Sequence, residues 1–346
     1  MEGDRDLAVG AAGVEHAPPG VRGRSGTLLA LAALAACTAF FYRDLLFENR
    51  AYVFRDMYTL FFAFEHTVRL LARWHWPPLW DPFAVLGRPF AADLVTAVYY
   101  PLNWGLRLLP EPHGLNLSIA LHHFIAAAGL FALLRYHRLS LMPAMLGALG
   151  FGFGGMMVSL DNLINGLRSA AWLPWIILTF EVWCERRSAT AVAGMAVTLG
   201  MAALGAMPEF MVFANALTIA LAVDRSHRGA GPSLPRSLTA LLVANVIAVG
   251  LCAVQLLPFA EYVMHSSRMS GLRAETVTAH SLFPLGVLAF LIPRHYIDAG
   301  GRFHETAALW EGTFTDAPWA LTLYLGVAVV LLVPAFRRLS RFQRCW

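Results

Sequence analysis

Long apolar runs, repeated along most of the chain, restrict its fold more than any other feature. Apolar residues make up 58% of the 346 residues and charged residues only 14%, whereas a soluble domain carries about 45–50% and about 25%. A soluble protein of this length needs a charged exterior, and long stretches here carry no charge. The sequence therefore predicts an all-α integral membrane protein with much of its surface facing lipid.

The apolar runs predict about eight transmembrane helices, because a crossing helix needs about 20 mostly apolar residues. The predicted spans are 25–42, 115–134, 142–160, 169–184, 189–205, 209–223, 237–262 and 318–335. They belong to one transmembrane domain at 27–336. Two further stretches, 92–110 and 281–293, are too short or too interrupted by proline to cross. The second is predicted to be a re-entrant or interfacial helix.

Arginines in the connections between these stretches predict how the spans are oriented. The following arginines fall on one side of the predicted membrane: Arg135, Arg138, Arg186, Arg187, Arg225, Arg228 and Arg236. Cytoplasmic loops carry an excess of Lys and Arg, so this side is predicted to be cytoplasmic. Residues 1–26 read as a disordered tail on the same side, and so does the basic end at 337–346. Both termini are thus predicted to be cytoplasmic.

The net charge of +4 comes from these arginines rather than from a nucleic-acid site. No basic stripe with interleaved aromatic residues occurs, which argues against a nucleic-acid partner. The four cysteines show no CxxC or Cys/His spacing. This pattern argues against a zinc site and against a disulfide framework.

The first loop, residues 43–114, is rich in Trp, Tyr, Phe and Pro and is predicted to be ordered outside the cytoplasm. Apolar residues recur at helical spacing over 57–74, which predicts an amphipathic helix lying on the membrane. They are Leu60, Phe61, Phe64, Val68 and Leu71, while His66, Arg69 and Arg73 would face water or headgroups. The WHWPPLWDPFAVLGRPF segment that follows predicts a compact interfacial turn.

Three carboxylates of this loop are candidates for chemistry. Asp56 stands between the first span and the amphipathic helix, where a carboxylate can act as a general base. Its alternative role is a solvated residue that pairs with Arg55 or caps the helix. Asp81 and Asp93 are rival cavity-lining candidates. Their alternatives are a turn carboxylate before Pro82 and a helix cap.

Other polar residues lie in or beside the predicted spans, where a polar group faces a cavity or a hydrogen-bonding partner. Gln255 and Glu261 are near the outer end of the seventh predicted span, and Glu209 is at the start of the sixth. All three are candidates for lining a cavity or for hydrogen bonds between helices.

Two further polar segments are predicted to have structural roles. His122 and His123 lie in the second predicted span, and adjacent residues do not share a helix face. They are therefore predicted to form hydrogen bonds between helices rather than a metal pair or a proton relay. The segment DNLINGLR, residues 161–168, is predicted to be a tight turn with a local ion pair, the alternative being that it lines the mouth of a cavity.

Several motifs occur in a fixed order: FRDMY, PPLWDPFAVLGRPF, AVYYPLNW and AVQLLPFAEYVMHSSR. Together they resemble the bacterial YfhO-type membrane proteins, which belong to the wider GT-C group of integral-membrane glycosyltransferases. The resemblance covers about 50–336. The LGAMPEFMVFA segment is also similar to the family's, but Met207 and Glu209 stand where the family often has His and Gln.

The resemblance implies a GT-C-like fold and a position in the bacterial inner membrane. It implies transfer of a sugar from a polyprenyl-phosphate donor to a glycan, lipid or protein acceptor of the cell envelope. The essential carboxylate of the family's first external loop falls on Asp56, which would be the catalytic base.

A donor of this kind needs cationic or N–H partners for its phosphate at the membrane surface. The HSSRMSGLR segment offers His265, Arg268 and Arg273 as donor-phosphate-binding residues. Its alternative is an ordinary polar loop beside the membrane. A divalent cation, Mg²⁺ or Mn²⁺, is left open, because a carboxylate and a phosphate can share one with water. No ligand cluster in the sequence demands it.

Two other classes of function stay open. A lipid or polymer transporter, such as a flippase, would also line a cavity with Glu, Gln, Arg and His, and internal repeats would favour it. The third class is a non-catalytic membrane scaffold. Members of the resembled family are usually longer, so a truncated family member belongs to this class.

Overall fold

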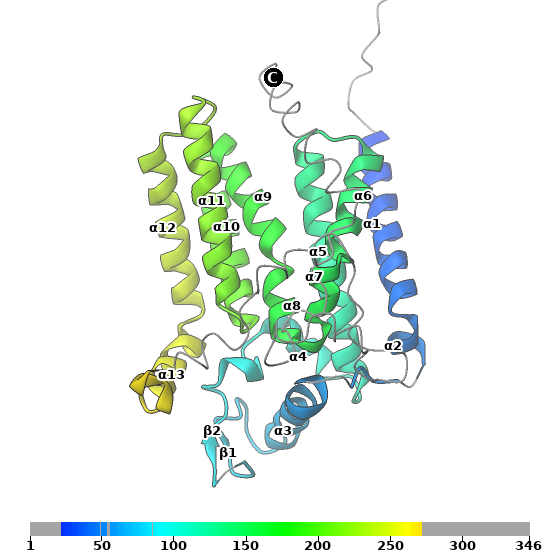
Figure 1. The fold of residues 1–346 in the computed structure, drawn as a ribbon, viewed down its shortest axis with the longest axis vertical. Helices are drawn as coiled ribbons and strands as arrows, with labels where there is room; N and C mark the ends of the chain where they lie inside the picture. Colours follow the sequence, from blue (N-terminus) through cyan, green and yellow to red (C-terminus); the bar gives the residue numbers. More distant parts are fainter. Residues whose placement is uncertain (1–21, 49, 54–55, 85, 272–346) are drawn as a thin grey trace, which may run out of the picture.

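The computed structural model describes residues 22–48, 50–53, 56–84 and 86–271, and within these ranges it is mostly helical. This confirms the predicted all-α class. The long helices lie side by side in a bundle (Figure 1). They are α1 (Arg22–Phe41), α5 (His113–Tyr136), α6 (Leu141–Gly152), α9 (Leu173–Arg186), α10 (Ala189–Leu204), α11 (Glu209–His227) and α12 (Leu234–Leu251).

Three segments of the described chain are long and apolar enough to cross a membrane. They are His113–Tyr136, Leu141–Asn162 and Leu234–Leu251. Shorter apolar helices cover Ser25–Phe41, Ala189–Leu204 and Ala253–Met264. Their composition supports a helical membrane protein. The predicted span at 318–335 and the predicted interfacial helix at 281–293 lie outside the described residues.

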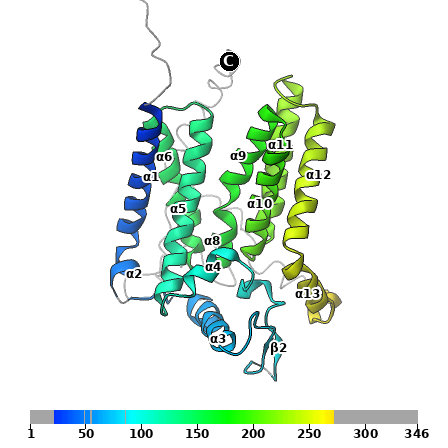
Figure 2. The same ribbon diagram turned by 180° about the vertical axis from the view of Figure 1, so that it is seen from behind.

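The two ends of the bundle differ in what they carry (Figures 1 and 2). One end, called the loop end below, carries residues 43–112 with their short elements. These are α2 (Arg43–Phe47), η1 (Met57–Phe61), α3 (Phe62–Ala72), β1 (Trp80–Asp81), β2 (Arg88–Pro89), η2 (Leu94–Thr96) and α4 (Pro101–Leu106). The other end, called the arginine end, holds the connections α5–α6, α9–α10 and α11–α12.

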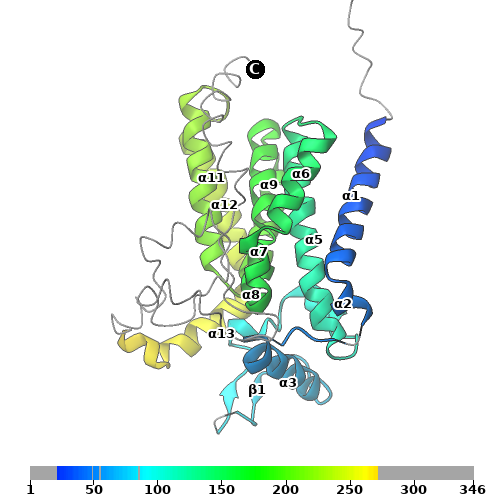
Figure 3. The same cartoon turned by 45° about the vertical axis from the view of Figure 1, so that its right-hand side comes forward.

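The helix predicted at 57–74 is present as η1 followed by α3, and it lies crosswise under the bundle (Figure 3). Its apolar stripe is buried through Phe61, Phe64, Val68 and Leu71, as the spacing predicted. His66 and Arg73 are exposed as expected, but Arg69 is not. The Arg69 side chain is only 21% exposed, because its Nη1 donates to the carbonyl oxygens of Arg107 at 2.7 Å and Leu109 at 2.6 Å.

The span predicted at 237–262 is wrong, because the structure divides it into two helices. Helix α12 ends at Leu251 and α13 (Ala253–Met264) begins after Cys252. Helix α13 turns aside at the loop end instead of continuing the bundle (Figure 1). The physical reason is a docking contact: Nε2 of Gln255 donates to the carbonyl oxygens of Ala91 at 2.9 Å and Ala92 at 3.2 Å. This amide is only 2% exposed.

The apolar core that positions the loop end joins four parts of the chain. Met57 and Phe61 of η1 pack with Leu115 and Ile119 of α5 and with Ile164 of α8 (Ile164–Ala170). Ahead of α8 lie α7 (Gly155–Ser159) and η3 (Leu160–Asn162), and Leu160 belongs to the same cluster. Burial of these side chains is the main force that holds the crosswise helix against the bundle.

Candidate functional site

Asp56 lies directly before η1, at the junction between the bundle and the crosswise helix. Its side chain is half-buried, and its neighbour Met57 is anchored in the apolar core of the loop end. The Asp56 side chain makes no capping hydrogen bond to η1. Within the described ranges the other carboxylates of residues 43–112 each face a cation, and Asp56 faces none. Arg55, the alternative partner of Asp56, lies outside the described residues. A carboxylate in this setting is available to accept a proton.

Asp81 and Asp93 are held together by Arg88. The Arg88 guanidinium lies 3.6 Å from Oδ2 of Asp81 through Nε, and 3.3 Å from Oδ2 of Asp93 through Nη1. It also lies over the Phe64 ring, 4.5 Å from the centroid. Arg88 therefore links the short strands to α3. The second oxygens accept from backbone N–H groups: Asp81 from Phe83 at 2.9 Å and Asp93 from Val95 at 3.0 Å. These are the turn and cap contacts that the sequence offered as alternatives.

A buried ionic network lies between α3, α4 and α8. Glu65 of α3 accepts two hydrogen bonds from Arg107, at 2.9 Å from Nε and 3.1 Å from Nη2. Arg168 of α8 is 2% exposed, and its Nη2 lies 3.9 Å from Oε1 of Glu65. Burial alone would raise the pKa of the Glu65 carboxyl. The charge and hydrogen bonds of Arg107, with the charges of Arg168 and Arg69, outweigh burial and lower that pKa.

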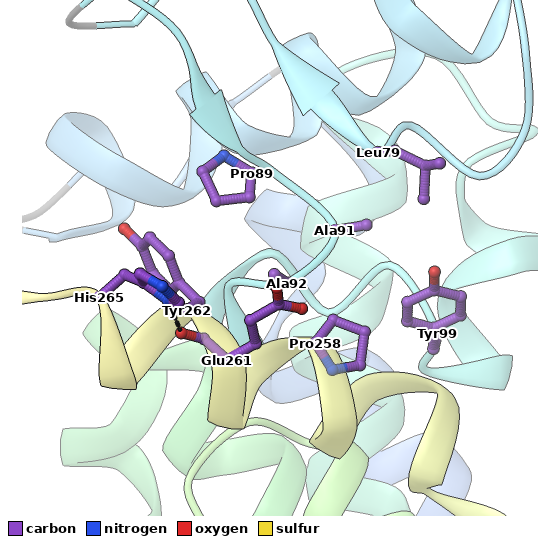
Figure 4. A pocket seen from close by; sticks show the side chains of 9 residues that line it. All are labelled: Leu79, Pro89, Ala91, Ala92, Tyr99, Pro258, Glu261, Tyr262 and His265. Carbon is purple, nitrogen blue, oxygen red and sulfur yellow. Dashed lines mark hydrogen bonds between the residues drawn. The ribbon is translucent and has the colours of Figure 1, made fainter.

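A cavity of about 440 Å³ opens between α13 and residues 79–99. Figure 4 shows Glu261 and Tyr262 of α13, with His265 directly after this helix, facing the strand-and-loop segment across this space. Of the five residues proposed to line a cavity, Glu261 lines this one, and Gln255 fixes its wall through the bonds to Ala91 and Ala92. Nδ1 of His265 donates to the carbonyl oxygen of Glu261 at 2.9 Å, and the residue is exposed.

A second polar cluster lies inside the bundle near the loop end. His123 of α5 is fully buried, and its Nε2 lies 2.8 Å from Oδ1 of Asp161. The Tyr42 hydroxyl donates to Oδ2 of Asp161 at 2.9 Å and lies 2.7 Å from Nε2 of His123. The predicted local ion pair between Asp161 and Arg168 is wrong, because each has a more distant partner in the chain: His123 and Glu65 respectively.

The adjacent His122 bonds in a different direction, as expected for neighbouring positions on a helix. Its Nε2 lies 2.6 Å from the Tyr100 hydroxyl, and that hydroxyl also accepts from Nε1 of Trp172 at 3.0 Å. The two histidines thus tie α5 to other elements by hydrogen bonds, as predicted.

The other predicted site residues are Glu209, Arg268 and Arg273. Glu209 is exposed at the first turn of α11. Arg268 lies in η4 (Ser267–Ser270), its side chain being outside the described set, and Arg273 lies outside the described residues. His265 and Asp56 lie at the same end of the bundle, but no described contact joins them. Among the described residues no group of His, Cys, Asp and Glu could hold a metal ion.

The sequence reasoning missed Glu65, Arg107 and Arg168 as a unit. One signal pointed to Glu65: it follows Phe61 by four residues and precedes Val68 by three, inside the apolar stripe of the helix. A carboxylate on the buried face of an amphipathic helix requires a cation, because an unpaired buried charge is too costly.

Comparison with known proteins identifies no matching family model, no matching curated protein and no matching solved structure.

Proposed function

We propose that this chain is an integral-membrane glycosyltransferase of the GT-C type, with Asp56 as its catalytic base. The observation that carries the proposal is the setting of Asp56. It is half-buried beside the apolar core of the loop end, and it is the one carboxylate of residues 43–112 without a cation among the described residues. The neighbouring carboxylates are occupied by structural ion pairs and are less suited to proton transfer.

The proposed reaction is a single displacement at the anomeric carbon of the donor sugar. Asp56 takes the proton of an acceptor hydroxyl while that oxygen bonds to the anomeric carbon. The bond from this carbon to the phosphate oxygen breaks, and polyprenyl phosphate leaves with the electron pair, so the anomeric configuration inverts. His265 with Arg268 and Arg273 is the proposed partner of the phosphate. A shared Mg²⁺ or Mn²⁺ is compatible with this scheme and is not required by it.

The Asp56→Asn variant is expected to lose about 100-fold or more of its turnover, because asparagine cannot accept the proton. The measurement is sugar transfer from a panel of polyprenyl-phosphate sugars by the full chain reconstituted in lipid. Asp44→Asn is the matched control. Asp44 belongs to the same loop, but it is 45% exposed and paired with Arg43 and Arg50, so its variant should keep native turnover.

Equal turnover in native protein and Asp56→Asn would remove Asp56 as the base. Donor binding should survive in Asp56→Asn, since the phosphate is assigned to other residues. If the native chain transferred sugar from none of the donors in the panel, the result would instead favour a non-catalytic scaffold.

We further propose about eight membrane crossings in the bacterial inner membrane, with both termini in the cytoplasm. The supporting observation is the segregation of arginines. The ends of α5, α9 and α11 carry Arg135, Arg186 and Arg225 in their last turns, and these ends lie together at the arginine end. The positive-inside rule then puts the loop end outside the cytoplasm.

Cysteine labelling tests this orientation. A membrane-impermeant maleimide added to intact spheroplasts should label Phe83→Cys at the loop end, where Phe83 is 67% exposed. It should label Ala230→Cys, an exposed position at the arginine end, only after the membrane is permeabilised. Both substitutions are made in a variant that lacks the native cysteines. The reverse pattern would invert the topology and place Asp56 in the cytoplasm, against the proposed reaction.

A transporter is the second candidate, and one observation favours it. Tyr42, His123 and Asp161 form a buried chain of polar groups inside the bundle, and such chains mark proton relays in transporters. A transporter would keep its activity in Asp56→Asn and lose it in Tyr42→Phe.

A further inference from the structure

Three arginines surround a small, partly open space between α3, α4, α5 and α8. Arg69, Arg107 and Arg168 all line it, and Glu65 is its acidic residue. A second carboxylate, Glu111, lies behind Arg69 at 3.2 Å. Three guanidinium groups therefore face two carboxylates, and one positive charge of the network has no protein counterpart among the described residues.

The uncompensated charge is located at Arg168. Arg107 makes two short hydrogen bonds to Glu65. Arg69 donates through Nη1 to two carbonyl oxygens and pairs with Glu111 at 3.2 Å, although its buried Nε has no hydrogen-bond partner among the described residues. Arg168 approaches Glu65 only to 3.9 Å. Its Nε is buried with no hydrogen-bond partner in the described structure. A 2% exposed guanidinium without an acceptor is costly, since a buried charge loses its hydration and gains nothing in return.

The space beside Arg168 is of atomic size. Its volume is about 10 Å³, enough for about one water-sized particle. Ser118 and Asn103 add polar groups to the wall. Gly114 lies in the first turn of α5 and lines the space, where a Cβ atom would lie 2.9 Å from Nη2 of Arg69. The N-terminus of this 24-residue helix adds partial positive charge to the same wall.

We infer that this space is a binding site for a small monovalent inorganic anion, with chloride as the ligand that fits. A single negative charge balances the network and supplies the acceptor that Arg168 lacks. Sulfate carries two negative charges, one more than the network lacks. The bound anion would fix α8 against α3 and α4, which is a structural role independent of the proposed sugar transfer.

The test is the thermal unfolding of the detergent-solubilised full chain in sodium chloride and in sodium gluconate at equal ionic strength. Chloride is expected to raise Tm along a saturating curve, by about 2 °C at ten times its Kd. Bromide should act in the same way, and sulfate should not. Identical Tm values in chloride and gluconate would overturn the proposal and leave a water molecule in the space.

Substitutions of single arginines test whether the chloride-dependent rise in Tm arises at Arg168. Arg168→Met should abolish the chloride-dependent shift, whereas Arg73→Met, at an exposed arginine after α3, should retain it. If Arg168→Met does not fold, Arg69→Gln serves instead, because it removes the surplus charge from a side chain that is 21% exposed. A full chloride response in Arg69→Gln or Arg168→Met would place the anion elsewhere and refute the assignment.

Discussion

The Glu65→Gln variant is expected to be less stable than the native chain by about 3–5 kcal/mol in free energy of unfolding. Glu65 is the carboxylate that Arg107 and Arg168 share, at 2.9 Å and 3.9 Å. Its side chain is 11% exposed and that of Arg168 is 2% exposed. Glutamine keeps the shape but not the charge, so guanidinium groups with little access to water would be left uncompensated.

Glu111→Gln is the matched control for this prediction. Glu111 faces Arg69 of the same network, but its side chain is 33% exposed and the pair is open to solvent. Exposed ion pairs contribute about 0–1 kcal/mol, so this variant should lose no more than that. Unfolding of the purified protein in detergent micelles, followed by circular dichroism, measures both. Equal losses in the two variants would mean that burial does not set the strength of the network.

The same ion pair predicts the direction of a pH effect. Because the pKa of Glu65 is lowered in the folded chain, the pair contributes fully above the ordinary pKa of glutamate. Its contribution is lost as the pH falls through the lowered pKa. The acid destabilisation of the native chain should therefore contain a component that Glu65→Gln lacks.

Features set by local sequence were predictable, and features set by distant contacts were not. The spacing of Phe61, Phe64, Val68 and Leu71 predicted the crosswise helix, because periodicity reports which face is buried. The bend at Cys252 was missed because α13 is apolar enough to continue the span before it. What turns it aside is the bond of Gln255 to Ala91, 164 residues earlier in the chain.

In the candidate site, too, local contacts were predictable from the sequence and contacts between distant residues were not. Asp93 accepts from Val95 and Asp81 from Phe83, two residues onward in each case, and such contacts can be read from turn and cap preferences. Glu65 and Arg107 are 42 residues apart. No local rule selects that partner, although the place of Glu65 on an apolar face shows that one is needed.

The Asp161→Asn variant is expected to lose about 1–3 kcal/mol of stability, the cost of leaving a buried polar group without its partner. Nδ1 of His123 lies 2.5 Å from the carbonyl oxygen of Gly152, which can only accept, so this nitrogen carries a proton. The Tyr42 hydroxyl donates to Oδ2 of Asp161, and Oδ1 of Asp161 lies 2.8 Å from Nε2 of His123, at 4% and 0% side-chain exposure. Asparagine replaces one of these two carboxylate oxygens by an NH₂ group, which cannot accept a hydrogen bond.

A double-mutant cycle separates the pair from a general loss of packing. His123→Leu replaces the ring by an apolar group, and the double variant with Asp161→Asn lacks both the ring and the carboxylate. Removing both partners costs less than the sum of the single changes when they form a buried pair, here by about 1–3 kcal/mol. Additive losses would show that Asp161 and His123 act independently. The Tyr42 hydroxyl and the carbonyl of Gly152 would then be the partners that hold His123 in place.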